Sequence, residues 1–244
     1  ILTDIRYLKN GVTTILDHHA SPNALRGSLS LLAEGFKEVG IRAGLSYEVT
    51  DRYGKNKTEE AIRENEGFIK EYGGNKKNEL ISALFGLHAS FTLSSETLQE
   101  CHEIARKLDA GFHLHLAEGG IDAIDSMERF KKPLVQHLKE EGILNEKTLA
   151  AHCVDLNKKD IKMLGKTNAM VITNPRSNAN NGVGIMPLDA MMKEGITVGI
   201  GNDGLGYDML EETKALQLMQ SSKAGTPSAL PPKILSGIFF VNNP

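Results

Sequence analysis

Two histidines and a glutamate stand close together in the segment Gly111–Gly120, whose sequence is GFHLHLAEGG. In an extended strand the side chains alternate between the two faces, so His113 and His115 should share one face. Glu118 follows three residues after His115. Because imidazole binds divalent metal ions and a nearby carboxylate can transfer protons, this spacing suits a metal-assisted hydrolytic site. Histidines on a buried strand can equally be hydrogen-bonded core residues, so the segment alone leaves both interpretations open.

The chain around this segment alternates short apolar runs with amphipathic stretches, which predicts strands followed by helices. Seven strands are expected, over residues 11–19, 41–49, 80–88, 148–154, 168–174 and 196–202, with the Gly111–Gly120 segment supplying the fourth. Helices are expected over residues 22–39, 58–72, 94–108, 121–141, 156–164, 187–194, 210–223 and 231–243. Ser94 or Ser95 should cap the third of these helices. The strands are apolar throughout rather than alternating, which indicates a parallel sheet covered on both faces.

Seven strand–helix units fall one unit short of a (β/α)8 TIM barrel, which typically takes about 250 residues. We therefore predict an α/β fold of this type over residues 1–244, as a single domain that lacks its first strand. The runner-up is an open doubly wound sheet, because Gly199, Gly201 and Gly204 match the dinucleotide-binding pattern GxGxxG. That pattern belongs to the first strand of a dinucleotide fold and requires an acidic residue after the next strand, whereas here only helical sequence follows.

Polar side chains stand at the C-terminal end of nearly every predicted strand, which is the end where barrel enzymes build their sites. In chain order they are His18, His19, Glu48, His88, His115, Glu118, His152, Asn174, Asn178 and Asp203. A core histidine would explain one of these positions but not the whole set, so their clustering favours a functional site. His102 and His137 fall inside predicted helices and are expected to be solvated surface residues.

The composition excludes several other classes of protein. The 244 residues have a formal net charge of -3, and the basic residues are scattered along the sequence. This pattern lacks the cluster of basic residues that is typical of nucleic-acid-binding proteins. No apolar run approaches the roughly 20 residues of a membrane span. The two cysteines, Cys101 and Cys153, have no paired spacing, so we expect a reducing compartment and a cytoplasmic protein. Because the chain opens on Ile1 without a signal peptide, it is expected to begin inside a longer protein.

Four motifs stand in an order and relative spacing that resemble those of the amidohydrolase superfamily. They are HLHLAE at 113–118, LAAHC at 149–153, NPRSN at 174–178 and GIGNDG at 199–204. Together they look like its cytosine-deaminase-like and chlorohydrolase-like branch, and DHHASP at 17–22 with the closing ILSGIFFVNNP most resembles the SsnA-type aminohydrolases. The resemblance implies a metal-dependent hydrolase barrel flanked by a small β-sandwich, both of whose segments would be missing from this chain.

The resemblance also implies a metal site, with one divalent ion, zinc or iron, in the complete protein. Motif matching makes His115 and Asp203 metal ligands. The family takes two further ligands from an HxH pair on its first strand, and no such first-strand pair occurs here. His18 and His19 are adjacent and would face opposite ways, so they cannot replace it. His113 is expected to be an inward-facing core or supporting residue rather than a ligand. This chain would then supply two of the metal ligands, His115 and Asp203, and lack the two of the first-strand HxH pair.

The implied reaction is deamination of an amino-substituted heterocycle, such as a purine, pyrimidine or triazine, by attack of a metal-bound hydroxide. Asp203 and His152 would orient the water and accept its proton, and Glu118 would pass a proton to the ring nitrogen and then to the departing amine. His88 and Asn178 would contact the substrate. For Asn178 an ordinary turn residue in PRSNANNG is an equal alternative.

Two other functions remain as alternatives. A barrel homologue without catalytic activity is the main one, because two metal ligands are unaccounted for, and a nucleotide-binding oxidoreductase is less favoured. The HxE and PCxxC signature of cytidine deaminases and the HExxH signature of zincins are both absent. The expected partner is therefore a small-molecule substrate, with neither nucleic acid nor membrane and with homo-oligomer formation left open.

Overall fold

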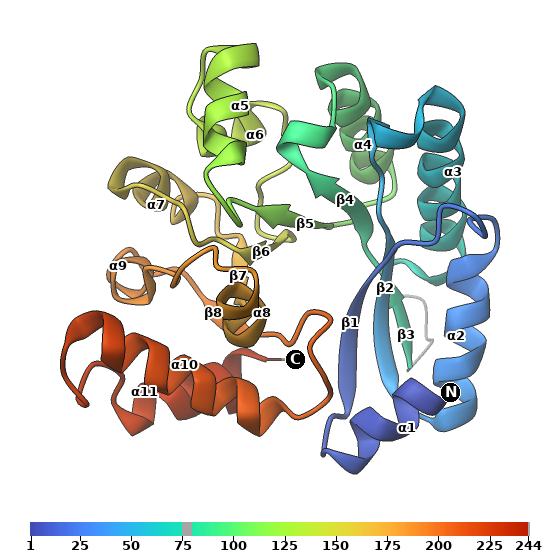
Figure 1. Ribbon diagram of the computed structural model, residues 1–244. Helices are drawn as coiled ribbons and strands as arrows, with labels where there is room; N and C mark the ends of the chain where they lie inside the picture. Colours follow the sequence, from blue (N-terminus) through green and yellow to red (C-terminus); the bar gives the residue numbers. More distant parts are fainter. Residues whose placement is uncertain (75–79, 244) are drawn as a thin grey trace. The chain divides into compact units, whose positions relative to one another are not determined.

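The computed structural model describes residues 1–74 and 80–243 as alternating strands and helices (Figure 1). The chain divides into two compact units. Unit 1 comprises Ile1–Leu114 and Leu138–Thr148, and unit 2 comprises His115–His137 and Leu149–Pro244. Among the described residues, no helix is both long enough and apolar enough to cross a bilayer.

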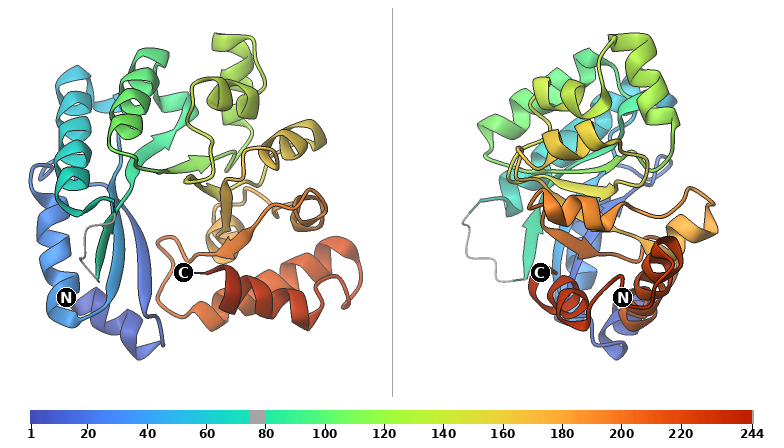
Figure 2. Two further views of the ribbon diagram at one scale, coloured as in Figure 1. Left: turned by 180° about the vertical axis from the view of Figure 1, so that it is seen from behind. Right: turned by 90° about the vertical axis from the view of Figure 1, so that its left-hand side faces the viewer.

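Unit 1 is built on parallel strands with helices on one side. Its strands are β1 (Thr14–His19), β2 (Arg42–Tyr47), β3 (Ile81–Ala83), β4 (Phe85–Ala89) and the first residues of β5 (Phe112–Leu116). Its helices are α1 (Leu2–Lys9), α2 (Ser28–Val39), α3 (Lys55–Tyr72), α4 (Ser95–Lys107) and the end of α6 (Leu134–Glu140). β1, β2 and β3 form a parallel sheet in that order. α2 and α3 pack against β2 and β3, and they flank the same side of this sheet in Figures 1 and 2.

The helices of unit 1 bury the apolar positions that the helical spacing predicts. On α2, Leu29 and Phe36 are buried, and each contributes roughly 1.5–3 kcal/mol through the transfer of its side chain from water. α4 begins after Ser94, whose hydroxyl oxygen accepts a hydrogen bond from the backbone N–H of Thr97 at 3.1 Å. This confirms the cap that was expected at Ser94 or Ser95 and places the start of α4 at the predicted position.

The predicted third strand, residues 80–88, is two strands in the structure, so the described chain has eight strands instead of seven. The fully buried side chain of Asn65 accepts from the backbone N–H groups of Tyr47 and Gly86, at 2.9 and 3.2 Å, and donates to the Tyr47 carbonyl at 2.8 Å. These bonds satisfy backbone groups that a continuous β2–β4 ladder would otherwise pair. The ladder is therefore interrupted, and the strand breaks at Leu84.

Unit 2 continues the alternation of strand and helix. Its strands are the end of β5, β6 (Leu149–His152), β7 (Met170–Thr173) and β8 (Val198–Ile200), which neighbour one another in that order. The β6–β7 and β7–β8 pairs are parallel. Its helices are α5 (Ile121–Phe130), the start of α6, α7 (Lys158–Leu164), α8 (Pro175–Asn180), α9 (Leu188–Lys193), α10 (Met209–Ala224) and α11 (Pro232–Gly237), with a π-helical turn over Ile238–Asn242. α8 and α10 pack against each other (Figure 1).

Three local expectations were wrong. α1 was not expected, because its buried residue is the acidic Asp4, which pairs with the N-terminal amine at 2.8 Å. The PRSNANNG segment contains the helix α8, which starts at Pro175, where a proline costs no helical hydrogen bond. His137 is only 1 % exposed, and its ring stacks on that of Phe130 with 3.8 Å between the centroids, so it is not a surface residue.

Two of the three glycines of the GxGxxG match, Gly199 and Gly201, have a packing role, whereas a Cβ atom at Gly204 would meet nothing within 4 Å. A Cβ atom at Gly201 would lie 2.5 Å from Oδ1 of Asn174, and one at Gly199 would lie 2.7 Å from Oδ1 of Asn243. The Asn243 side chain bonds both the backbone N–H and the carbonyl of Ile200, at 2.8 and 3.0 Å. Because asparagine side chains lie directly on β8, only glycine fits there. This explanation removes the observation on which the oxidoreductase alternative rested.

Candidate functional site

The site residues of unit 2 follow strands whose ends have unusual backbone conformations. Ala117 after β5, His152 and Cys153 at the end of β6, and Asp203 after β8 all have positive φ angles, between 48° and 71°. Such angles in residues other than glycine cost of the order of 1–3 kcal/mol each and concentrate at functional sites. The backbone N–H groups of Cys153 and Val154 donate to the carbonyls of Leu116 and Ala117 at 2.9 Å, which holds the ends of β5 and β6 together.

His152 is buried, and a neighbouring amide orients its ring. Its Nδ1 lies 2.9 Å from Oδ1 of Asn178 on α8, and the amide nitrogen of Asn174 lies farther from the same atom, at 3.4 Å. Because an amide oxygen only accepts, the shorter contact places the proton on Nδ1 and leaves Nε2 as a base. Nε2 is 3.9 Å from Oε2 of Glu118, and the ring stacks on that of His115 with 5.5 Å between the centroids.

A chain of hydrogen bonds joins the carboxylates of Glu118 and Asp203. The amide nitrogen of Asn181 donates to Oε1 of Glu118 at 3.0 Å and lies 3.5 Å from the hydroxyl oxygen of Ser177. That hydroxyl donates to Oδ2 of Asp203 at 2.5 Å, and the backbone N–H of Gly204 donates to Oδ1 at 2.7 Å. Ser177 and Asn181 are four residues apart, which is about one helical turn, so their side chains are neighbours on one face. Ser177 bonds Asp203 and Asn181 bonds Glu118, and this turn therefore sets the separation of the two carboxylates.

Asp122, in the first turn of α5, is a buried acid in the same unit. It is 2 % exposed, and its Oδ1 has no hydrogen-bond partner among the described residues. Burial raises the pKa of Asp122 to about 7, and the negative charges of Glu118, Asp125 and Asp155 raise it further. The carboxyl group therefore changes between its neutral and charged forms close to neutral pH.

We expect Asp122→Asn to flatten the pH dependence of stability. Because the folded-state pKa of Asp122 lies above its ordinary value of 3.8, its contribution to stability is complete below pH 4 and is lost as the pH rises towards 7. The free energy of unfolding should therefore fall by on the order of 2–3 kcal/mol more in the wild type than in the variant between pH 5 and 7. Urea denaturation of both proteins at pH 5, 6, 7 and 8 measures this. Parallel curves would contradict the assignment.

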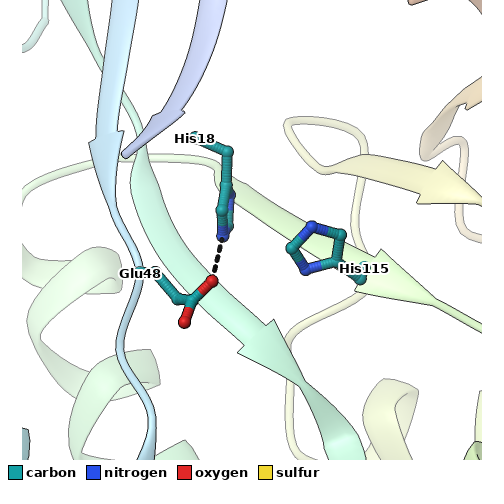
Figure 3. A group of neighbouring side chains, drawn as sticks. All are labelled: His18, Glu48 and His115. Carbon is teal, nitrogen blue, oxygen red and sulfur yellow. Dashed lines mark ion pairs between the residues drawn. The ribbon is translucent and has the colours of Figure 1, made fainter. Parts of the chain in front are cut away.

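In unit 1, the predicted residues His18, Glu48 and His113 form a second cluster. Nε2 of His18 is 3.8 Å from Oε2 of Glu48, as Figure 3 shows, and the His18 ring contacts the His113 ring edge-on with centroids 4.7 Å apart. Figure 3 also draws His115, which belongs to unit 2. Glu48 pairs with Arg52 at 2.7 Å. Burial raises the pKa of the Glu48 carboxyl, and the charge of Arg52 opposes that effect.

His19 and His88 have separate surroundings in unit 1. Nε2 of His19 lies 2.9 Å from the hydroxyl of Ser21, and its ring packs edge-on against Tyr47. Burial lowers the pKa of His19. Nδ1 of His88, on β4, lies 2.9 Å from the hydroxyl of Thr92.

Unit 2 thus brings together most of the residues expected in the site. His115, Glu118, His152, Asn178 and Asp203 are connected by the contacts described above. Asn178 is wrongly read as a turn residue, because it lies in α8 and is buried. Sequence reasoning missed Ser177 and Asn181. Their helical spacing could have indicated them once the NPRSN segment was recognised as the start of a helix.

The donor types of unit 2 fit a divalent metal ion. Two imidazoles, His115 and His152, and two carboxylates, Glu118 and Asp203, are the ligand types that zinc and iron share in proteins. Among the described residues of this unit, however, no three such donors lie within 4.8 Å of one another. The ligand types of unit 2 therefore fit a divalent ion. These four side chains need further ligands to complete the coordination of that ion.

Comparison with known proteins places these residues in a family context. Residues 5–233 match the model of the group described as "Amidohydrolase family". A 5'-deoxyadenosine deaminase from Methanopyrus kandleri is 33 % identical over 232 residues, which are 93 % of this chain and 52 % of that protein. The chain thus spans about half the length of this curated relative.

Solved structures match the fold over nearly the whole chain. An adenosine deaminase from Xanthomonas campestris with bound zinc superposes with a TM-score of 0.86 at 21 % identity, covering 97 % of this chain and 53 % of that one. Atrazine chlorohydrolase TrzN from Arthrobacter aurescens TC1, complexed with zinc, gives 0.84 at 18 % identity, covering 97 % and 57 %. The chain therefore has the α/β fold of amidohydrolase TIM-barrel structures.

Proposed function

Because the chain belongs to the amidohydrolase family, we propose that the complete protein is a metal-dependent hydrolase that deaminates an amino-substituted heterocycle. The observation that carries the proposal is the arrangement in unit 2, where His152 faces Glu118 and hydrogen bonds link Glu118 to Asp203. An imidazole and two carboxylates held in this way suit the successive proton transfers that hydrolysis of a carbon–nitrogen bond requires.

His115 and Asp203 are the residues of this chain that would hold the ion, zinc or iron. A bound divalent ion supplies Lewis acidity, which lowers the pKa of water from 15.7 towards about 7. The 33 % identical relative is about twice as long as the matched region. We propose that the rest of a longer protein supplies the first barrel strand, with the HxH pair, and the flanking β-sandwich.

Three side chains of unit 2 would carry out the proton transfers and the orientation of water. Nε2 of His152, which carries the lone pair in the neutral tautomer that the Asn178 contact favours, would accept a proton from the attacking water. Asp203, held by Ser177 and Gly204, would orient that water. Glu118 is partly exposed, with 32 % of its side-chain surface accessible, so it can meet the substrate. It would relay the proton that His152 takes from the attacking water, across the 3.9 Å between Nε2 and Oε2, to the ring nitrogen. It would then relay the remaining proton of the added hydroxyl to the amine, which leaves as ammonia as the carbonyl forms.

His88 and Asn178 remain proposed substrate contacts, and for Asn178 the position in the structure also supports an indirect role. Its side chain is 1 % exposed and bonds His152. We expect Asn178→Ala to lower kcat by about 10–100-fold with little change in KM, because the His152 tautomer would no longer be fixed. Steady-state kinetics measure the two constants separately. A rise in KM alone would indicate a substrate contact instead.

Among the substrate classes, an aminopurine nucleoside is favoured. The relative from Methanopyrus kandleri is named a 5'-deoxyadenosine deaminase, and the amino group of an adenine ring can leave as ammonia in the proposed reaction. Pyrimidines and triazines remain in the proposal as substrates of the same reaction. The narrower SsnA-type assignment rests on DHHASP and the closing ILSGIFFVNNP. In either case we propose a cytoplasmic enzyme that acts on a small molecule.

The proposal is tested by ammonia release from full-length protein reconstituted with zinc or with iron. The panel comprises 5'-deoxyadenosine, guanine, cytosine and an aminotriazine, each with a matched sample stripped of metal. We expect release from at least one purine compound, dependent on metal. Stoichiometric metal with no release from any amino-heterocycle would favour the alternative, a barrel homologue without catalytic activity.

A further inference from the structure

We infer that Glu212 is a positioning residue for Asp203 and acts through Arg176. The inference rests on the proposed function, since it concerns the residue that is proposed to hold the metal and orient the water. Glu212 lies on α10, nine positions after Asp203, and the sequence motifs do not include it. The structure buries it completely.

Glu212 makes two hydrogen bonds to one residue at the start of α8. Its Oε1 accepts from Nε of Arg176 at 2.6 Å, and its Oε2 accepts from the backbone N–H of the same residue at 3.1 Å. That backbone N–H belongs to the first turn of α8, where no helical acceptor exists. A buried carboxylate therefore fixes both the backbone and the side chain of Arg176, and with them the start of α8.

Arg176 in turn holds the loop that carries Asp203. Its Nη2 donates to the carbonyl oxygen of Leu205, two residues after Asp203. The loop passes so close that a Cβ atom at Gly206 would lie 2.9 Å from Nη2, and Gly206 has a φ of 109°, which only glycine adopts readily. One guanidinium thus bridges a fully buried carboxylate and the loop between β8 and α10.

Two contacts position Asp203, one made by α8 and one made by the loop that carries Asp203. Ser177, the residue after Arg176, donates to Oδ2 of Asp203 at 2.5 Å, and the loop held at Leu205 contains Asp203 itself. The charge of Asp203 is among the causes that raise the pKa of Glu212, after burial, so the two carboxylates lie near each other. Loss of the Glu212 contact should release α8 and the loop together.

A purely structural role for the pair would anchor α10 to α8 and affect only stability. The test therefore measures zinc binding as well as unfolding, in the full-length protein. We expect Glu212→Gln to weaken the affinity for zinc, titrated against a chromophoric chelator, by about 10–100-fold. Amide hydrogen exchange of residues 202–208 in the metal-free protein should accelerate at least tenfold, and kcat should fall with KM nearly unchanged.

The matched control is Glu211→Gln, which makes the same change one residue earlier on the exposed side of α10. The exposed side chain of Glu211 forms an ion pair with Lys214 at 3.6 Å. This variant should keep wild-type zinc affinity and exchange rates. Arg176→Lys is the second test variant, in case Glu212→Gln does not fold. A single ammonium group cannot bond Glu212 and Leu205 as the guanidinium does, so a smaller loss of zinc affinity is expected.

A double-mutant comparison separates positioning from general loosening. If Glu212 acts on Asp203 through α8, Glu212→Gln and Ser177→Ala should affect zinc affinity less than additively, because both remove the same restraint. Wild-type zinc affinity in both Glu212→Gln and Arg176→Lys, with only a lower unfolding temperature, would overturn the inference. Zinc affinity and hydrogen exchange need no substrate. A wild-type protein that binds zinc without releasing ammonia would therefore count against the proposed function and not against this inference.

Discussion

Replacing Glu118 with glutamine should lower kcat for ammonia release by about 10²–10⁴-fold while the metal content of the full-length protein stays the same. This loss corresponds to about 3–5 kcal/mol of transition-state stabilisation. Glutamine has the same shape, and its amide oxygen can still accept from Nδ2 of Asn181, which lies 3.0 Å from Oε1 in the wild type. The variant therefore removes the carboxylate that relays protons and leaves the local packing intact.

The matched control for this prediction is Glu128→Gln on the exposed side of α5. It makes the same chemical change in the same unit, outside the hydrogen-bonded array, and should keep wild-type kcat. Kinetics of both variants should be paired with metal analysis of the same samples. If Glu118→Gln retains kcat within threefold, another group transfers the proton, and the role assigned to Glu118 is wrong.

The second large effect is expected at His115, where substitution by alanine should reduce the zinc content from about one ion per chain to near zero. An imidazole that closes the ligand set cannot be replaced by a methyl group. The ring of His115 lies beside that of His152, with a 26° angle between their planes, so the vacated space would adjoin the proposed base. Activity should be lost together with the metal.

Two further histidine variants sharpen this prediction. His102→Ala, on α4 in unit 1, changes the histidine content without touching the site residues of unit 2 and should retain zinc. His113→Ala, two residues before His115 on β5, tests the assignment of the ligand within the HLH sequence. Retention of zinc by His115→Ala together with its loss from His113→Ala would reverse that assignment.

Hydrophobic periodicity is enough to predict the strand order of this protein, whereas the helices α1 and α8 were missed. Runs of apolar residues indicated every strand in the described chain, and only the division of residues 80–88 into β3 and β4 was missed. The division depends on the amide of Asn65, which bonds Tyr47 and Gly86 from 18 and 21 residues away along the chain. No local pattern reports a contact of that kind, because periodicity records only which face of an element is buried.

Burial of charge was the least predictable property. Glu212 is fully buried on α10, whereas Leu210 on the same helix is 65 % exposed, which reverses the usual preference of both residue types. The carboxylate is tolerated because Arg176, 36 positions earlier in the chain, supplies two hydrogen bonds. Asp122 shows the same limit, since its pKa of about 7 depends first on its burial in the fold and then on the acids that the fold gathers around it.

The amino-acid sequence by itself determined the order of the elements and the side chains that end each strand. Parallel strands place their C-terminal ends on one edge of a sheet, and among the polar residues there the motif resemblance singled out His115, Glu118, His152 and Asp203. Only the tertiary structure decided how these groups are joined. Asn181 and Glu118 are separated by 63 positions, and a hydrogen bond over such a separation exists only when the folded chain brings the two side chains together.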